Sequence, residues 1–320
     1  MKLTVLGCGR WGTFLASYHS ANHDVMLWGR PGSASMQELM ETRKNSYLTL
    51  PENLRLTQDL GQAMEWADAV IISISAQHLR QLAAQLQQME IAGKVFILCM
   101  KGIEVSTNKR LTQVMEEEIH QPIQTAVWVG PGHVQDFSAG IPNCMVVDSA
   151  SPETTDWVVE QLGSELIRLY KGRDLIGTEV GAAAKNVIGI AAGVLDGIGY
   201  TSLKGALMAR GAREISRLIR SMGGNELSAY GLCHLGDYEA TLFSAHSHNR
   251  RFGESFVKGE HFDHLAEGAS TVKALVELGS QNQVELPICR AVYDMLYEGK
   301  DVHECLPKLF QRTVKGEFDY

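Results

Sequence analysis

The sequence lacks the paired cysteines and histidines that metal and redox motifs need. None of its 11 histidines stands in an HExxH or comparable zinc spacing. Its six cysteines are scattered over 320 residues without a CxxC pair, at Cys8, Cys99, Cys144, Cys233, Cys289 and Cys305. We therefore expect reduced, packed thiols and no bound metal.

Long apolar runs and a surplus of positive charge are also missing. No stretch approaches the ~18–20 apolar residues that span a bilayer. The apolar run at the N-terminus is too short for a signal peptide and leads into a glycine-rich turn. The formal net charge is −8, whereas proteins that bind nucleic acid or anionic membranes carry a basic face. We expect a cytoplasmic protein that neither inserts into membranes nor binds nucleic acid, although a local basic site for a small anion remains compatible with this charge.

The chain does contain enough apolar residues, 45%, for two domains with substantial cores. Its first half alternates strand-like and helix-like segments. Strands are expected at 3–7, 24–30, 67–75, 94–100, 125–130 and 143–149, and helices at 11–20, 35–42 and 79–89. Continuous β-branched runs suit strands that are buried on both faces. The first half therefore predicts an α/β fold with a doubly wound, Rossmann-type sheet.

The pattern changes near residue 174. The segment GTEVGAAAKNVIGIAAGVLDGIG has small and apolar residues at helical spacing, and the amphipathic stretch 203–223 ends on glycine, a usual helix stop. We therefore predict two domains, 1–174 and 175–320, the second mostly α-helical. Amphipathic stripes in the second domain fit an internal core or a two-fold interface equally, so a homodimer is one of two open alternatives.

A glycine-rich motif follows the first expected strand directly and precedes the first helix. Gly7, Gly9 and Gly12 form a GxGxxG pattern. Gly7 permits a tight turn, Gly9 lets the backbone approach a pyrophosphate, and Gly12 lets helix and strand pack closely. The helix N-terminus then offers free N–H groups to the phosphates. This context, more than the pattern alone, predicts dinucleotide binding.

The end of the second expected strand bears on the choice between NAD and NADP. An NAD-selective site usually carries Asp or Glu there to hold the ribose 2′-hydroxyl. This chain has Trp28, Gly29 and Arg30 instead. Arg30 could pair with the 2′-phosphate of NADP or be an ordinary surface arginine. The sequence therefore predicts NAD or NADP without deciding between them.

Several separated segments together match one family. In chain order they read GCGRWGT, ADAVIISISAQHLR, KGIE, GPGHVQDFSAGIPN, GTEVGAAAKNVIGIAAGVLDGIG, GLCHLGDYEAT and SHNRRFG. In order and spacing they resemble NAD(P)-dependent glycerol-3-phosphate dehydrogenases, and the likeness covers nearly the whole chain, through LPICRAVYDMLYEG. The resemblance implies a Rossmann domain that binds NAD or NADP and a helical domain that binds a small phosphorylated substrate and carries the catalytic groups.

The resemblance assigns the chemistry to two lysines and an aspartate. Ketone reduction needs a proton donor and groups that stabilise the developing alkoxide. Lys185 is implied as the proton donor, since burial would bring its pKa toward a useful range. Without the resemblance, a snorkelling helix lysine is the simpler interpretation. Lys101, at the end of a strand, is implied to stabilise the alkoxide or orient the substrate. Asp237 is implied to pair with both lysines, although alone it could be a helix cap.

The remaining implied contacts divide between substrate and cofactor. The substrate-binding residues are Asn186, Thr241, His248, Asn249 and Arg250. The cofactor-binding residues are Gly7, Gly9, Arg10, Trp11, Gly12, Arg30, Lys101 and Glu267.

The match is weakest where a phosphate would bind. The family pattern has arginine beside Asn249, and this chain has His248 there. A neutral imidazole lacks the planar fork of a guanidinium. His248 could be protonated when ligand is bound, or Arg250 and Arg251 could compensate. The family loop GPSFA also reads GPGHV here, from Gly130 to Val134.

These departures leave three functions open. The leading one is reversible reduction of dihydroxyacetone phosphate to sn-glycerol 3-phosphate, which supplies phospholipid synthesis. The second is dehydrogenation of another small phosphorylated or acidic ketone or alcohol, because fold alone does not fix substrate. The third is an NAD(P)-binding protein without turnover, which the joint presence of Lys101, Lys185 and Asp237 argues against. Feedback regulation cannot be read from the residues.

Overall fold

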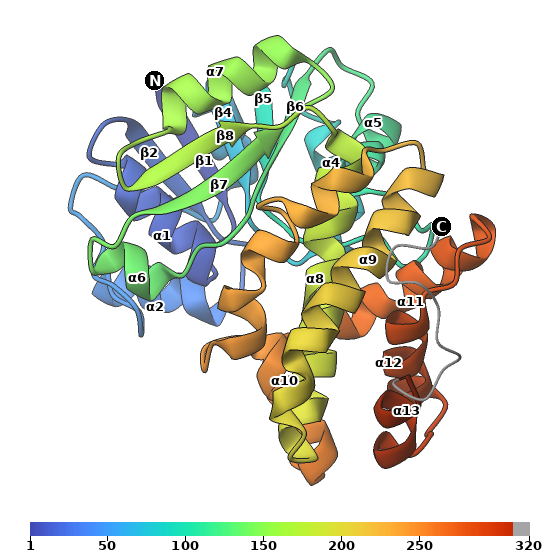
Figure 1. Ribbon diagram of the computed structural model, residues 1–320. Helices are drawn as coiled ribbons and strands as arrows, with labels where there is room; N and C mark the ends of the chain where they lie inside the picture. Colours follow the sequence, from blue (N-terminus) through green and yellow to red (C-terminus); the bar gives the residue numbers. More distant parts are fainter. Residues whose placement is uncertain (310–320) are drawn as a thin grey trace.

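The structure, a computed structural model, describes residues 1–309: an eight-stranded sheet followed by packed helices (Figure 1). The sheet order is β3-β2-β1-β4-β5-β6-β7-β8, and only the β6–β7 pair is antiparallel. The strands are β1 (Lys2–Leu6), β2 (Asp24–Trp28), β3 (Arg55–Thr57), β4 (Ala69–Ile72), β5 (Val95–Leu98), β6 (Gln124–Val129), β7 (Asn143–Asp148) and β8 (Ile167–Lys171).

Helices cover both faces of the sheet and then form the second half of the chain. Around the sheet lie α1 (Arg10–His19), α2 (Ala34–Thr42), α3 (Leu60–Trp66), α4 (Leu79–Leu86), α5 (Leu111–Glu118), α6 (Val134–Ser138) and α7 (Pro152–Leu162). The second half contains α8 (Leu175–Gly197), α9 (Lys204–Ser221), α10 (His248–Lys258), α11 (Glu267–Gln281), α12 (Pro287–Tyr297) and α13 (Val302–Leu309). Short helical turns are η1 (Ala76–His78), η2 (Thr201–Leu203), η3 (Glu226–Tyr230), η4 (Leu235–Asp237) and η5 (Glu239–Phe243).

The central strands are buried on both faces, as their continuous apolar runs predict. In β4, Ala69 and Ile71 pack into the cluster that includes residues of α1, α6 and α7. Val70 and Ile72 point to the opposite face and pack with α3, α4 and α5. This alternation follows from the two-residue period of a strand. The predicted α/β fold class, with a Rossmann-type sheet and a helical second part, is confirmed.

Helix α8 is the core of the second half. Its residues 177–195 are all buried, and α9, α10, α11 and α12 pack around it. By length and composition this helix could cross a membrane, whereas the sequence predicted no membrane span anywhere in the chain. In the structure 89% of that window is buried inside the protein. The amphipathic stripe of α9 likewise faces this core, through Leu207, Ile215 and Leu218.

Two glycines let α8 and α10 approach with their backbones almost in contact. A Cβ atom added at Gly193 would lie 1.9 Å from the carbonyl oxygen of Arg250. A Cβ added at Gly253 would lie 2.2 Å from the carbonyl oxygen of Ile190. Because backbone cannot move aside as a side chain can, only glycine fits at these positions.

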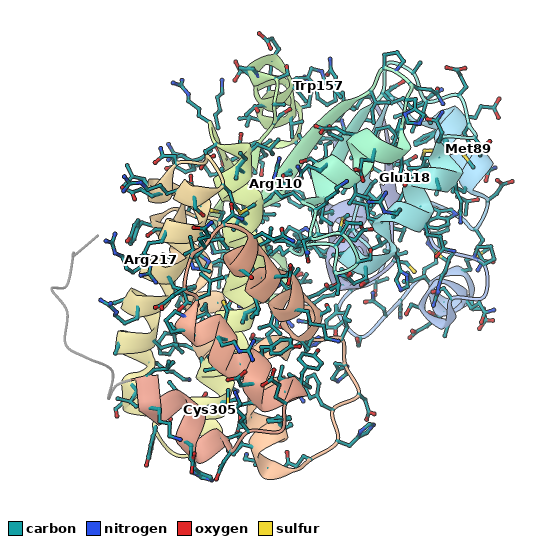
Figure 2. The ribbon with its side chains drawn as sticks, turned by 90° about the vertical axis from the view of Figure 1, so that its right-hand side faces the viewer. Met89, Arg110, Glu118, Trp157, Arg217 and Cys305 are labelled. Atoms are coloured by element: carbon teal, nitrogen blue, oxygen red, sulfur yellow. The ribbon has the colours of Figure 1, made fainter. Side chains whose placement is uncertain are left out.

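An ion pair joins the N-terminus of α5 to α8. Glu179 of α8 accepts hydrogen bonds from the Thr112 amide (2.9 Å) and from the guanidinium of Arg110, which Figure 2 labels where the two parts meet. Burial raises the pKa of Glu179, and Arg110 opposes that shift. Since these partners satisfy the carboxylate, the pair fixes α8 against the first turn of α5.

We expect Gly193→Ala to lower the free energy of unfolding by about 1–3 kcal/mol, because the added methyl forces α8 and α10 apart. Gly205→Ala is the matched control, since a Cβ there meets no atom within 4 Å and alanine suits a helix better than glycine. Denaturant unfolding of the two variants measures both effects. Equal stability of the two variants would contradict the close-packing account.

Candidate active site

Lys101 lies just beyond the carboxyl end of β5, where open α/β sheets bind ligands. Its ammonium group donates hydrogen bonds to the carbonyl oxygen of Gly130 (2.7 Å) and to Oδ2 of Asp237 (2.6 Å). Gly130 has a φ of +129°, which favours glycine at this turn after β6. Lys101 is therefore fixed between the sheet and the second half of the chain.

Lys185 reaches the same carboxylate from the middle of α8. Its Nζ lies 3.0 Å from Oδ2 of Asp237 and donates to Oγ1 of Thr241 (2.8 Å). The Thr241 hydroxyl in turn donates to the carbonyl oxygen of Asp237 (2.7 Å). Burial lowers the pKa of Lys185 to about 8, and the attraction of Asp237 limits that shift. Lys185 can therefore exchange a proton near neutral pH.

Hydrogen bonds made by His234 and Tyr238, on either side of Asp237 in the chain, fix this segment against α8. His234 is fully buried, and its Nδ1–H donates to the carbonyl oxygen of Gly181 (2.8 Å). Its Nε2 accepts from the Tyr238 hydroxyl (2.6 Å). Burial lowers the pKa of His234 to about 4, which keeps the ring neutral, as these two hydrogen bonds require. The single carboxylate of Asp237 thus faces two ammonium groups, and the cluster keeps a net positive charge suited to an alkoxide.

The two predicted amides bridge the parts of the site. Asn186 donates through Nδ2 to the carbonyl oxygen of Lys101 (3.1 Å), and its Oδ1 accepts from Asn249 (3.0 Å). Oδ1 of Asn249 accepts from the backbone of Gly268 (2.9 Å), next to Glu267. This chain of bonds links β5, α8, α10 and α11. Asn186 thereby fixes the backbone of Lys101, and Asn249 fixes Asn186, while their predicted contact with substrate stays a prediction.

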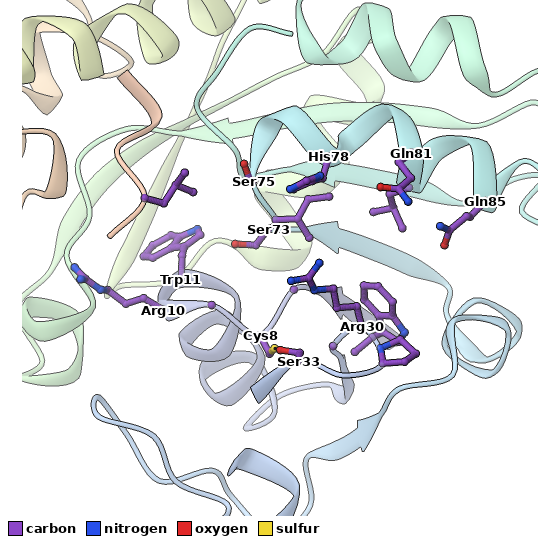
Figure 3. A pocket seen from close by; sticks show the side chains of 18 residues that line it. Cys8, Arg10, Trp11, Arg30, Ser33, Ser73, Ser75, His78, Gln81 and Gln85 are labelled. Carbon is purple, nitrogen blue, oxygen red and sulfur yellow. The ribbon is translucent and has the colours of Figure 1, made fainter. Parts of the chain in front are cut away.

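A cavity of about 710 Å³ lies over the glycine-rich loop (Figure 3). A Cβ at Gly7 would lie 2.2 Å from the Ser73 carbonyl oxygen, and one at Gly12 would lie 2.0 Å from that of Gly7, so both positions need glycine. A Cβ at Gly9 meets nothing within 4 Å, which leaves the helix N-terminus open to a ligand. The volume and this opening fit a dinucleotide.

The other predicted cofactor ligands fall into two groups. Arg10, Trp11 and Arg30 line the cavity. Glu267 stands apart from the cavity lining, with Oε1 accepting from the Ala76 amide (3.4 Å) and Oε2 buried without a hydrogen-bond partner among residues 1–309. Burial raises the pKa of this carboxyl. An unpaired buried acceptor beside Gly102, the residue after Lys101, suits a donor group on a bound ligand.

Comparison with known proteins decides the family. Two family models match the chain, NAD-dependent glycerol-3-phosphate dehydrogenase N-terminus over residues 2–155 and C-terminus over residues 174–307. The chain belongs to this family. It is 38% identical to the glycerol-3-phosphate dehydrogenase (NAD(P)+) of Chlorobium phaeobacteroides over 336 residues and 37% identical to that of Levilactobacillus brevis over 336 residues. Each alignment covers at least 99% of both chains.

Solved structures agree with this membership. The glycerol-3-phosphate dehydrogenase of Coxiella burnetii superposes with a TM-score of 0.91 at 26% identity, over 97% of this chain and 99% of that one. A D-mandelate dehydrogenase structure, at 13% identity and a TM-score of 0.64, shares the fold alone. The predicted family, its enzyme class and its NAD(P) cofactor class are confirmed.

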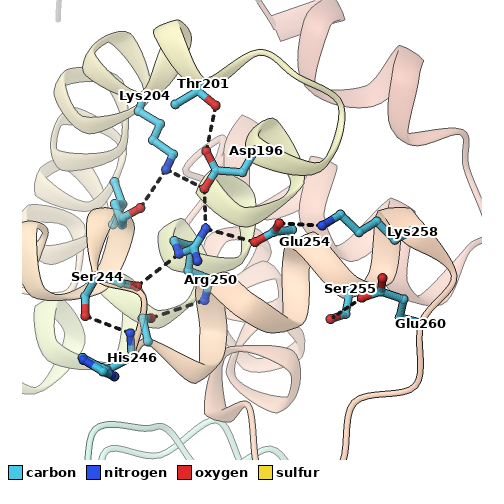
Figure 4. Close-up of polar contacts among 12 residues, drawn as sticks. Asp196, Thr201, Lys204, Ser244, His246, Arg250, Glu254, Ser255, Lys258 and Glu260 are labelled. Carbon is cyan, nitrogen blue, oxygen red and sulfur yellow. Dashed lines mark hydrogen bonds and ion pairs between the residues drawn. The ribbon is translucent and has the colours of Figure 1, made fainter.

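Arg250, a predicted substrate ligand, is engaged by other groups of the protein in this structure. Its guanidinium pairs with Asp196 (2.7 Å) and Glu254 (3.1 Å) and donates to the Ser244 carbonyl oxygen (3.1 Å), as Figure 4 shows. Lys204 joins the same Asp196 carboxylate at 2.6 Å. This ion-pair network ties α8, α9 and α10 together and engages Nε and Nη1 of Arg250 within the protein.

Sequence reasoning gave no role to His133, which the structure places near the cluster. Its Nε2 is buried without a hydrogen-bond partner among the described residues. Burial lowers its pKa, while Asp237 raises it and Lys185 lowers it, so its ring lies within electrostatic reach of both. The altered GPGHV loop was the available signal. Within residues 1–309, no group of three or more potential ligand side chains is placed to hold a metal ion.

We expect Lys185→Ala to lower kcat by at least about 100-fold, because the buried proton donor is lost. Binding of NADH or NADPH should be unchanged, since Lys185 lies outside the cavity over the glycine-rich loop. Steady-state kinetics and cofactor fluorescence titration measure the two effects. Activity close to that of the unaltered enzyme would rule out Lys185 as the proton donor.

The pKa of Lys185 also predicts opposite pH profiles for the two directions. Ketone reduction needs the protonated amine, so kcat/KM should be level below pH about 8 and fall above it. Alcohol oxidation needs the neutral amine, so kcat/KM should rise toward pH about 8 and then level off. The test is kcat/KM against pH in both directions. Profiles that bend in the same sense would contradict this assignment.

Proposed function

We propose that this enzyme reduces dihydroxyacetone phosphate reversibly to sn-glycerol 3-phosphate, using NADH or NADPH, and so supplies the backbone of glycerophospholipids. One observation carries the proposal: Lys101, Asp237 and Lys185 form a buried cluster in a chain that matches the family from end to end. A binding protein without turnover would have no use for two lysines held at one carboxylate, one of them buried.

The chain's own groups provide the proton and the charge stabilisation. When bound, the reduced nicotinamide supplies a hydride. Lys185 holds a proton on Nζ and delivers it to the substrate oxygen as charge develops there. Thr241 accepts a hydrogen bond from the same Nζ and so orients it. Lys101, held by the same Asp237 oxygen, places a second ammonium group beside the site that opposes the charge of the alkoxide.

Asp237 and Asn186 act as positioning residues in this mechanism. The Asp237 carboxylate keeps both ammonium groups within 3.0 Å of one oxygen atom. Asn186 holds the backbone of Lys101 against α8. Because these contacts cross from the sheet to the helices, the cluster forms only when both parts of the chain are packed together.

The proposal also covers the cellular compartment and the assembly of the enzyme. We place it in the cytoplasm, where six free thiols stay reduced. A homodimer and the division into domains at 1–174 and 175–320 stay predictions, and residues 310–320 of the second domain lie outside the described residues. Dehydrogenation of another small phosphorylated or acidic ketone or alcohol is the alternative, which the exchange at His248 suggested.

The direct test is oxidation of NADH and of NADPH by the purified enzyme, with dihydroxyacetone phosphate beside a panel of other ketones. We expect turnover with dihydroxyacetone phosphate and little with unphosphorylated dihydroxyacetone, because a bound phosphate contributes several charge-assisted hydrogen bonds. Intact cofactor binding without turnover on this substrate, but with turnover on another ketone, would favour the alternative.

Arg30 allows a separate test of cofactor choice. It lines the cavity beside Ser33 and forms no ion pair within residues 1–309, so its charge is available to a 2′-phosphate. We expect Arg30→Gln to raise the KM for NADPH about tenfold and to leave that for NADH nearly unchanged. An equal effect on both cofactors would show that Arg30 does not distinguish them.

A further inference from the structure

The side chain of Arg10 crosses from the glycine-rich loop to the N-terminus of α10. Arg10 is the first residue of α1, and its Nη2 lies 2.7 Å from Nε2 of His248, the first residue of α10. Its guanidinium carbon lies 4.9 Å from the ring centroid of Tyr47, a cation–π contact that also holds it in place. Figure 3 shows Arg10 beside Trp11 at the wall of the cofactor cavity.

His248 holds this guanidinium as a neutral hydrogen-bond acceptor. Burial lowers the pKa of His248, and the charge of Arg10 lowers it further. The neutral Nε2 therefore accepts a hydrogen bond from Arg10. The imidazole is itself fixed by stacking on His264, with ring centroids 4.8 Å apart and planes at 21°. His248 consequently holds the Arg10 cation in place and is not itself the cation at this site.

The charge of Arg10 has no counter-ion in the protein. Within residues 1–309 no carboxylate lies at ion-pair distance from it, whereas Arg250 and Arg110 are both engaged by carboxylates. The N-termini of α1 and α10 add their partial positive charges at this place. The next residue along α10, Asn249, is hydrogen-bonded to Asn186, which in turn is bonded to the backbone of Lys101, so the residue that holds the guanidinium adjoins one that reaches the catalytic cluster.

We propose that Arg10 of α1 binds a phosphate group at this site. It would take the role of the arginine that the family pattern carries at position 248 of α10. The inference rests on the proposed function and names the residue that makes phosphate recognition possible despite His248. The guanidinium supplies the planar fork that imidazole lacks. The phosphate could be that of the substrate or one from the cofactor pyrophosphate, and both are anionic oxygens within the same chemistry.

The first test compares Arg10→Gln with the unaltered enzyme. If the phosphate is the substrate's, KM for dihydroxyacetone phosphate should rise at least about tenfold at saturating NADH, while the Kd for NADH stays unchanged. If it is the cofactor's, the Kd for NADH, measured by fluorescence without substrate, should rise by a similar factor. Arg10→Lys should fall between, because it keeps the charge and loses the fork.

The decisive variant removes the guanidinium at position 10 and introduces one at position 248. Arg10→Gln combined with His248→Arg should recover most of the lost affinity, although a merely structural role of Arg10 would give no such rescue. Arg168→Gln is the matched control, since Arg168 also stacks on a tyrosine, Tyr170 at 5.1 Å, but lies on β8. It should leave both constants unchanged.

The outcomes separate this inference from the proposed function. If Arg10→Gln leaves both KM and Kd unchanged, the inference is wrong even when the enzyme turns over dihydroxyacetone phosphate. The inference is also wrong if Arg10→Gln lowers the affinity for a phosphate ligand and adding His248→Arg does not restore it, because Arg10 would then not take the role of an arginine at position 248. If the unaltered enzyme does not use dihydroxyacetone phosphate, the proposed function fails, and the Kd for NADH still decides whether Arg10 binds a cofactor phosphate.

Discussion

The shared carboxylate of Asp237 is the interaction on which the site depends. One oxygen atom lies 2.6 Å from Lys101 and 3.0 Å from Lys185, and almost none of Asp237 is exposed to solvent. Two ammonium groups would repel each other without it. With it, both amines are held at one oxygen atom, while burial brings the pKa of Lys185 to about 8. The cluster thus gives Lys185, the more buried of the two lysines, a proton that it can exchange near neutral pH.

The fold positions this interaction by packing α8 closely against its neighbouring helices. Gly193 and Gly253 bring α10 against α8, Arg110 pairs with Glu179 to fix α8 against α5, and His234 clamps η4 to α8. Lys185 stands in the middle of this buried helix. Its amine is therefore desolvated by the same packing that stabilises the second half of the chain. Because α8 both forms the core of the second half and carries Lys185, a variant that loosens its packing should also change the pKa of Lys185.

The sequence was informative where local pattern determines structure. The continuous apolar runs predicted β1, β2, β4, β5, β6 and β7, and the glycine motif predicted the cavity at Gly7 and Gly9. It did not predict β3, with three residues, or β8, whose burial alternates without an apolar run. Arg10 was expected to bind cofactor, but its contact with His248, 238 positions away, is tertiary and leaves no local signal. For the same reason, the ion pairs that occupy Arg250 could not be foreseen.

The central claim is that Asp237 tunes Lys185 and holds both lysines in place. Its most direct test is kcat/KM against pH for Asp237→Asn, measured with dihydroxyacetone phosphate beside the unaltered enzyme. The account predicts a loss of at least about 100-fold, together with a descending limb that moves to lower pH, because Lys185 loses the charge that limits its pKa shift. NADH affinity should stay unchanged, which would show that the variant is folded. An unaltered pH profile, with full activity, would contradict the account.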